Sequence, residues 1–184
     1  MKLNYFYCTF SFFLFFLFYA NSYSFTLTKP DEEFLDMVEK QTFNYFSECT
    51  DPDKGLVLDR APNSKKCDLN YAPATIAGVG FGLSAFIVGI ERGWVDKRTA
   101  ETLTLNTLNY FLKTMFNKNG FYYHFVDMTT GKRVWTCEVS SVDTALFVAG
   151  VLLAMEYYDN PEIKKQADLI YRRHSQPVFW PAKA

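Results

Sequence analysis

The sequence predicts an all-α protein with one hydrophobic core. Apolar residues recur at the i, i+3, i+4 spacing of a helix in five successive segments. Most of these segments start with a residue that favours a helix N-terminus, and the turns between the later ones are short. Hydrophobic residues make up 49% of the 184 residues, which is enough for a single domain. Consecutive helices joined by short turns are expected to pack as antiparallel neighbours.

The first two expected helices cover residues 31–47 and 74–92. Asp31 can cap the first helix, where acidic residues also suit the helix dipole. The second contains four glycines, each of which costs a helix up to about 1 kcal/mol relative to alanine. We therefore expect this helix to pack closely against a neighbour, and we expect Gly93 to end it.

The other three expected helices cover residues 96–117, 140–158 and 160–172. Asp96 can cap the third, and Pro161 suits the first position of the fifth. The fourth is apolar on almost every face, so it needs neighbours on most sides. Five helices barely provide them, which indicates that part of the fold is missing from this sequence.

Two longer connections interrupt the helices. Residues 49–73 form a polar connection with a short apolar strand at 56–58, and connections of this length are commonly functional or flexible. At its centre, Asp59 and Arg60 either contact a polar ligand or form a local ion pair. The aromatic stretch that starts at residue 120 predicts a β-hairpin with its turn at residues 129–131.

Both ends of the chain are expected to lie outside the folded domain, which would cover residues 23–173. Residues 1–22 are typical of a secretory signal peptide, because Lys2 precedes an apolar run too short to span a membrane comfortably. Cleavage is expected after Ser22, with Ser24 as the alternative site, and an uncleaved signal anchor is the alternative reading. The mature protein would be secreted or periplasmic, with no stable membrane anchor. Residues 174–184 have two prolines and no periodicity, which predicts an irregular tail.

Charge and cysteine content argue against several classes of function. The net charge of −1 gives no reason to expect nucleic acid or an anionic membrane surface as a partner. The chain has two histidines and no metal-type cysteine pair, so neither a metal nor another cofactor is expected. Cys49 and Cys67 flank a polar loop, where they either form a disulfide in an oxidising compartment or remain free and mostly buried.

Two carboxylates beside aromatic residues make a candidate carbohydrate site with catalytic residues Glu138 and Asp143. Inverting glycoside hydrolysis needs one carboxylic acid to protonate the leaving oxygen and one carboxylate to activate water. Glu138 has apolar sequence neighbours that would raise its pKa and suit the acid. Asp143, near a helix N-terminus, would stay ionised and suit the base or sugar binding. Asp143 could instead only cap the helix, or Ser140 could be the cap.

Nearby side chains could bind the sugar. Trp135 and Tyr122 offer aromatic faces that can stack on a sugar ring. His124 either hydrogen-bonds a sugar hydroxyl or is structural. Asp127 is expected to shape the hairpin turn, and Arg133 could pair with it across the strands. The expected substrate-binding set is His124, Trp135, Tyr122, Asp59, Arg60, Asp127 and Arg133.

Five segments of the sequence each contain a motif, and the motifs follow one another in a specific order: residues 55–60, 75–85, 90–95, 120–135 and 138–146. The first reads Gly-Leu-Val-Leu-Asp-Arg and the last Glu-Val-Ser-Ser-Val-Asp-Thr-Ala-Leu. In this order they resemble the bacterial glucoamylase-like family, which includes endo-β-1,2-glucanases. The likeness spans most of the mature chain, and five blocks together are far more specific than any one of them.

The resemblance implies a fold and a reaction. Members of the family form an (α/α)6 toroid, two rings of helices with a sugar cleft at one end, and hydrolyse a β-linked glucan with two acidic residues, by inversion. This chain holds only about five helices, roughly half of such a barrel. The expected fold is therefore a partial (α/α)6 toroid with one β-hairpin inserted. A frameshifted or truncated gene would account for the Pro-rich tail that replaces the remaining helices.

The resulting hypothesis is an exported glycoside hydrolase, or a truncated part of one, that acts on a β-linked glucan, with β-1,2-glucan as the first choice. A non-catalytic half-barrel that binds carbohydrate or a partner protein is the first alternative, and an inactive truncated gene product is the second. A missing C-terminal half would be a partner that supplies a further acid and much of the cleft. The sequence leaves open whether this chain alone is active, and whether it would act in the endo or exo mode.

Overall fold

The computed structural model describes residues 26–63 and 66–175, which belong to two units divided after Val38. The predicted signal peptide and most of the predicted tail lie outside the described residues. In the first unit, the described residues contain the start of helix α2 (Lys29–Glu48). There the Thr28 backbone N–H donates to Asp31 Oδ2 at 3.0 Å, and the Asp31 N–H donates to Thr28 Oγ1 at 3.4 Å. Thr28, not Asp31 as predicted, therefore has the capping role, and Asp31 reaches back to it.

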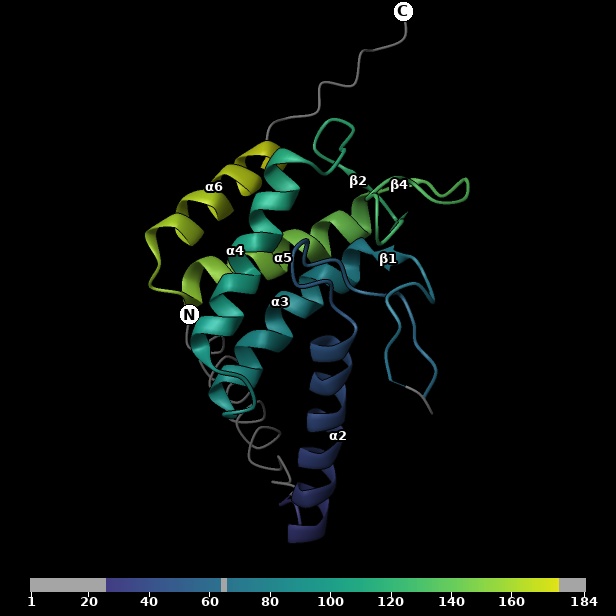
Figure 1. The fold of residues 1–184 in the computed structure, drawn as a ribbon. Coiled ribbons are helices and arrows are strands. Elements are labelled where there is room, and N and C mark those ends of the chain that lie inside the picture. Colours follow the sequence, from purple (N-terminus) through teal and green to yellow (C-terminus); the bar gives the residue numbers. More distant parts are fainter. Residues whose placement is uncertain (1–25, 64–65, 176–184) are drawn as a thin grey trace, which may run out of the picture. The chain divides into compact units, whose positions relative to one another are not determined.

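The second unit contains the other helices and all the strands of the described residues (Figure 1). Its complete helices are α3 (Ile76–Glu91), α4 (Lys97–Lys113), α5 (Ser141–Tyr157) and α6 (Pro161–Ser175). The five expected helices are thus present, and the all-α prediction is confirmed. The expected second helix starts two residues late, because Ala74 and Thr75 pair as strand β1 (Ala74–Thr75) instead.

Helices α3 and α5 form one layer and run in the same direction. At their ends, the Tyr157 hydroxyl donates to Glu91 Oε1 at 2.7 Å. Helices α4 and α6 form a second layer and are also parallel to each other. Between them, Gln166 Nε2 lies 3.3 Å from Asn109 Oδ1. Further along, the Arg173 guanidinium donates to the Phe111 carbonyl at 3.2 Å. The layers pack through α3 on α4 and α5 on α6, as alternating inner and outer helices of a toroid do (Figure 1).

The glycines of α3 permit a very close helix crossing. A Cβ atom built on Gly80 would lie 2.2 Å from the Leu146 carbonyl oxygen, and one on Gly150 would lie 2.2 Å from the Gly80 carbonyl oxygen. The backbones of α3 and α5 are therefore in direct contact, and no side chain fits between them. This confirms that the glycines of this helix serve close packing.

Two clusters of buried side chains hold these layers together. In the larger one, the ring of Phe111 on α4 stacks on Phe147 of α5 with centroids 4.2 Å apart, and Tyr122 meets both rings edge-on. In the smaller one, Phe43 of α2 packs against Phe86 and Trp94. Trp94 is therefore partly buried against this cluster.

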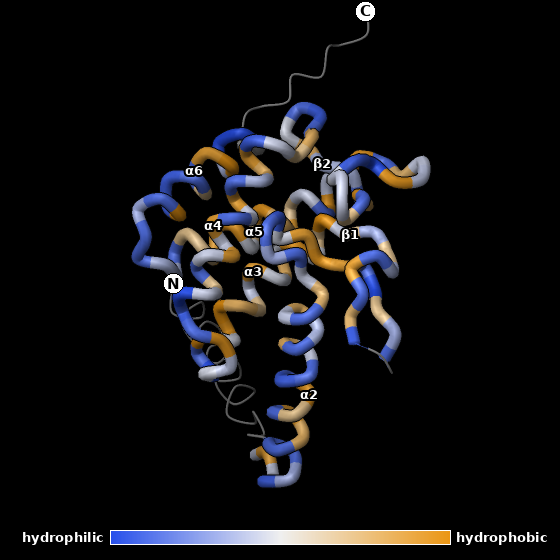
Figure 2. The backbone as a smooth tube through the Cα atoms, viewed as in Figure 1, coloured by the Kyte–Doolittle hydropathy of each residue, from blue (hydrophilic) through white to orange (hydrophobic). Residues whose placement is uncertain are grey.

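Gly93 and Asp96 have their predicted roles at the end of α3 and the start of α4, but α4 ends at Lys113 and not at residue 117 as predicted. Gly93 follows α3 with φ of 70°, a left-handed conformation that glycine adopts without strain. The Asp96 side chain accepts a hydrogen bond from the Thr99 N–H at 2.9 Å, so it caps α4. Helix α6 alternates hydrophilic and hydrophobic residues along its length (Figure 2), as an outer helix with one buried face should.

Part of the apolar surface of α3 and α5 has no cover within the described residues. Phe81 on α3 is 54% exposed, and Val142 and Leu153 on α5 are 68% and 45% exposed. The first layer is therefore buried on the side of α4 and α6 and open along one flank. None of the described helices is long and apolar enough to cross a membrane.

Four two-residue strands cover the N-terminal ends of α3 and α5. Strand β1 pairs antiparallel with β3 (Phe125–Val126), and β2 (Tyr122–Tyr123) pairs antiparallel with β4 (Val139–Ser140). The predicted hairpin is therefore present but short, with an isolated bridge between Val126 and Arg133. The strand partner changes between β2, which pairs with β4, and β3, which pairs with β1. The candidate site lies at this change of partner.

Candidate functional site

His124 is the residue at which the chain changes strand partners. Its backbone N–H donates to the Glu138 carbonyl at 3.0 Å, and its own carbonyl accepts from the Ile76 N–H at 3.2 Å. The first bond ties it to the segment that enters α5, and the second ties it to the first residue of α3. The backbone of His124 therefore links the N-terminal ends of both inner helices.

The imidazole of His124 lies between the two predicted catalytic carboxylates. Its Nδ1 is 3.1 Å from Glu138 Oε1, and its Nε2 is 3.7 Å from Asp143 Oδ1. The ring also stacks on Phe125 with centroids 3.7 Å apart, which fixes its orientation. The structure thus brings together three residues predicted for the site.

Ser140 and Asp143 begin helix α5 and share its capping interactions. Asp143 N–H donates to Ser140 Oγ at 3.1 Å, and the Ser140 hydroxyl donates to Asp143 Oδ2. Ser140 is therefore the cap, which answers the question that the sequence left open. Asp143 lies in the first turn, only 8% exposed, with its other carboxylate oxygen directed at His124.

Glu138 does not have the surroundings that its sequence neighbours suggest. Its side chain is 67% exposed. Hydrogen bonds from its own backbone N–H and from His124 hold the pKa of its carboxyl below the usual range. The expectation of an apolar site and a raised pKa is therefore wrong, because the carboxylate is largely exposed to solvent and hydrogen-bonded.

Trp135 and Asp127 line one side of an open hollow of about 280 Å³, and residues 69–73 line the other. The indole of Trp135 is 61% exposed, and its backbone φ is 51°. Asp127 shapes the turn as predicted, because its Oδ1 accepts from the N–H groups of Thr129 and Thr130 at 3.2 and 2.7 Å. The residues on the opposite side were missed, because nothing in the polar connection distinguishes them in the sequence.

Several predicted sugar ligands have other roles. Tyr122 is 0% exposed, so its ring belongs to the core and cannot stack on a sugar; this prediction is wrong, because β2 directs Tyr122 inward. Asp59 and Arg60 form the local ion pair at 2.9 Å that was the alternative reading. Arg133 does not pair with Asp127; its guanidinium carbon lies 4.9 Å from the centre of the Tyr123 ring.

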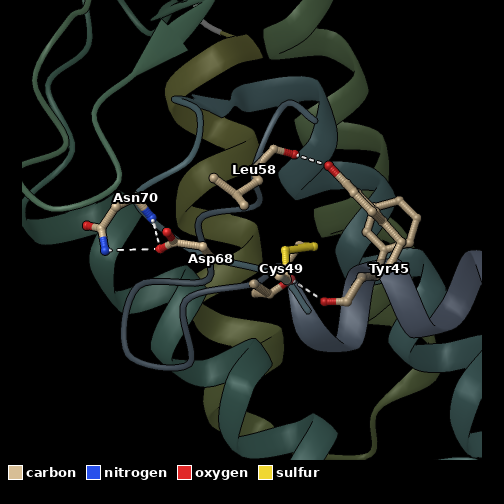
Figure 3. The surroundings of a disulfide bond; sticks show 8 residues. Tyr45, Cys49, Leu58, Asp68 and Asn70 are labelled. Atoms are coloured by element: carbon tan, nitrogen blue, oxygen red, sulfur yellow. Dashed lines mark hydrogen bonds between the residues drawn. A yellow bond between two sulfur atoms is a disulfide. The ribbon is translucent and has the colours of Figure 1, made fainter. Parts of the chain in front are cut away.

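Cys49 and Cys67 form a disulfide, with Cα atoms 5.4 Å apart (Figure 3). It joins the C-terminal end of α2 to the arm of the long connection that leads to the hollow. Cys137 is a free thiol whose Sγ lies 3.4 Å from the Phe125 carbonyl oxygen. In the described part of the chain, no group of three His, Cys, Asp or Glu side chains is placed to hold a metal ion.

Comparison with known proteins finds a similar sequence and similar structures, each belonging to a longer chain. No family model matches the sequence. An exo-β-1,2-glucooligosaccharide sophorohydrolase of Parabacteroides distasonis is 31% identical over 157 residues, which cover 80% of this chain and 21% of that protein.

Solved structures give the same result. An endo-β-1,2-glucanase of Chitinophaga pinensis superposes with a TM-score of 0.63 at 26% identity, over 80% of this chain and 36% of its own. A candidate glucoamylase of Bacteroides uniformis superposes with a TM-score of 0.64 at 28% identity, over 82% of this chain and 36% of its own. The chain therefore spans roughly a third or less of the length of these relatives.

Proposed function

We propose that this chain contributes to hydrolysis of a β-linked glucan. Its sequence and fold match part of the glucoamylase-like family, which confirms the predicted resemblance and the partial toroid. The observation that carries the proposal is His124 held between Glu138 and Asp143 at the strand-covered end of α3 and α5. The named relatives support β-1,2-linked glucooligosaccharides as the substrate.

The arrangement of the two carboxylates supports a part for each in hydrolysis by inversion. The imidazole holds them apart, and inverting enzymes keep their acid and base about 6.5–9.5 Å apart to leave room for the attacking water. Asp143, buried in the first turn of α5, is suited to orient water or a sugar hydroxyl. Glu138 is the exposed member, and a bound sugar would remove it from water and raise the pKa of its carboxyl, as an acid requires.

His124 is proposed to position both groups. With Nδ1 at Glu138 and Nε2 near Asp143, one ring can hold the two carboxylates in register. Export through the N-terminal signal remains part of the proposal, and it suits the disulfide, because disulfides persist in oxidising compartments.

The test is product formation from β-1,2-glucooligosaccharides, measured by chromatography, with the anomer of the product followed by NMR. We expect wild type to release product of inverted configuration, and Glu138→Gln and Asp143→Asn each to slow release at least about 100-fold. Glu156→Gln on α5 and Asp53→Asn are matched controls on exposed carboxylates and should retain full activity. Equal rates in wild type and both site variants would refute the proposal.

A second function, sugar binding without turnover, is favoured by one specific observation. The lowered pKa of Glu138 keeps its carboxyl ionised at neutral pH, and an ionised carboxylate cannot protonate a leaving oxygen. Saturable oligosaccharide binding by wild type, with no product after long incubation, would support this second function over hydrolysis.

A further inference from the structure

We propose that the hollow between residues 69–73 and 127–135 binds a sugar ring of an oligosaccharide whose neighbouring unit lies at His124. This inference rests on the proposed function and adds to it a second sugar-binding position, formed by Tyr71 and Trp135.

The hollow is formed by two arms that leave a common pair of strands. Ala74 of β1 pairs with Val126 of β3. From this pair, residues 69–73 extend along one side and residues 127–135 along the other, and both line the hollow. Its volume of about 280 Å³ is near the lower end of the range for small-molecule pockets, roughly 300–1,000 Å³. A single sugar ring is a ligand of suitable size.

Both arms are anchored, so the hollow is preformed. The Cys49–Cys67 disulfide fixes one end of the first arm. At its other end, the Asp59 N–H donates to the Pro73 carbonyl at 2.8 Å. Between these anchors, Asp68 Oδ1 accepts from the Asn70 N–H at 2.9 Å (Figure 3). A preformed site loses little conformational entropy on binding.

Aromatic side chains stand exposed on both sides of the hollow. Tyr71 is 54% exposed and Trp135 is 61% exposed. Trp135 also has φ of 51°, a left-handed conformation that is a genuine outlier for a bulky residue. Strain of this kind persists where the surrounding structure enforces it, and it clusters at ligand-binding sites. The fold thus holds a large apolar ring in water, in an unfavourable backbone conformation, at the edge of a hollow.

A series of rings connects the hollow to the carboxylates. The indole of Trp135 packs edge-on against Phe125 with centroids 5.3 Å apart. Phe125 in turn stacks on His124 at 3.7 Å. A ligand on Trp135 is therefore two ring contacts from the imidazole between Glu138 and Asp143, a spacing suited to adjacent units of one oligosaccharide.

Asp127 supplies a polar group to the same hollow. Hydrogen bonds from the backbone and side chain of Thr130 hold the pKa of its carboxyl below the usual range, so it is an anion at neutral pH. Within the described residues, the hydrogen bonds of its side chain go to Oδ1. Oδ2 is left to accept a sugar hydroxyl, while the aromatic faces contact the ring.

The test is calorimetric titration of the full chain with β-1,2-glucooligosaccharides of increasing length. We expect wild type to gain affinity as the oligosaccharide grows from one site into the other. Trp135→Gly and Tyr71→Ala should each lower the affinity for the longer oligosaccharides about tenfold and abolish the gain with length. Tyr171→Ala, which removes an exposed ring from α6, is the matched control and should bind as wild type does.

Trp135→Gly also separates a binding role from a structural one. Glycine adopts φ of 51° without strain, so the melting temperature should stay the same or rise while the affinity falls. Unchanged affinity in both variants, or no binding by wild type at any length, would overturn the proposal. Binding of this kind without hydrolysis would contradict the proposed hydrolase and leave the second sugar position intact.

Discussion

Gly80 on α3 and Gly150 on α5 bring the two inner helices into backbone contact, with a Cβ on Gly150 only 2.2 Å from the Gly80 carbonyl oxygen. The consequence reaches the candidate site. Helix α3 starts at Ile76, which holds the His124 carbonyl, and α5 starts beside Asp143. The crossing of the two glycines therefore determines how far His124 lies from Asp143.

Gly80→Ala and Gly150→Ala should each destabilise the protein by about 2 kcal/mol, measured by urea unfolding. The added methyl group meets backbone atoms, which cannot move aside as a side chain can, and overpacking of this kind costs ~1–3 kcal/mol. Gly82→Ala is the control in the same helix, because its Cβ would come no closer than 3.0 Å to a methyl group of Val57. A loss of stability as large for Gly82→Ala would show that the crossing is not the cause.

Ser140→Ala should remove the cap of α5 and lower the free energy of unfolding by about 1 kcal/mol. The same change removes the hydroxyl that donates to Asp143 Oδ2, so oligosaccharide affinity should fall as well. Ser141→Ala, one residue along and exposed, is the matched control. Loss of stability with unchanged affinity would mean that Ser140 does not help to orient Asp143.

Tyr157→Phe should flatten the dependence of stability on alkaline pH. The hydrogen bond to Glu91 raises the pKa of Tyr157 to about 12 from 10.0. A raised pKa in the folded state adds stability that is complete below pH 10.0 and is lost as the pH rises to about 12. Thermal melts across this range, with Tyr171→Phe as the control, should show the loss in wild type and a smaller one in Tyr157→Phe. An identical decline in both would contradict the assignment.

Reduction of Cys49–Cys67 should both destabilise the protein and weaken sugar binding at the hollow. A bridge between residues 18 apart stabilises by roughly 3 kcal/mol in the chain-entropy account. It also anchors the arm that carries Tyr71. The paired variant Cys49→Ser/Cys67→Ser should behave like the reduced protein, and Cys137→Ser should behave like wild type. Full affinity in the paired variant would show that the disulfide does not hold the hollow in place.

The helices could be predicted from the sequence because each has its own signals. Apolar periodicity, Asp96 and Pro161 are local features, and local hydrogen bonds and packing determine them. The glycines of α3 also identified a close helix contact, since nothing else offsets their cost in a helix. Which helix makes that contact could not be read from the pattern, because the partner is distant in sequence.

The candidate site could be predicted only in part. His124, Glu138 and Asp143 were identified together, and the structure brings them together. The apolar surroundings predicted for Glu138 were wrong, because sequence neighbours do not determine how far a side chain is exposed to solvent. Tyr122 was misassigned for the same reason. The hollow was missed because it depends on a disulfide and a pair of strands between distant segments.

The most direct test of the central claim is NMR chemical-shift mapping of the chain with a β-1,2-glucooligosaccharide. The claim is that the strand-covered end of α3 and α5 is a glycan site built around His124. We predict saturable shifts at the His124 ring and the Trp135 indole, both reduced in Asp143→Asn, and none at the ring of Tyr171. Shifts confined to other surfaces, or no shifts at all, would contradict it.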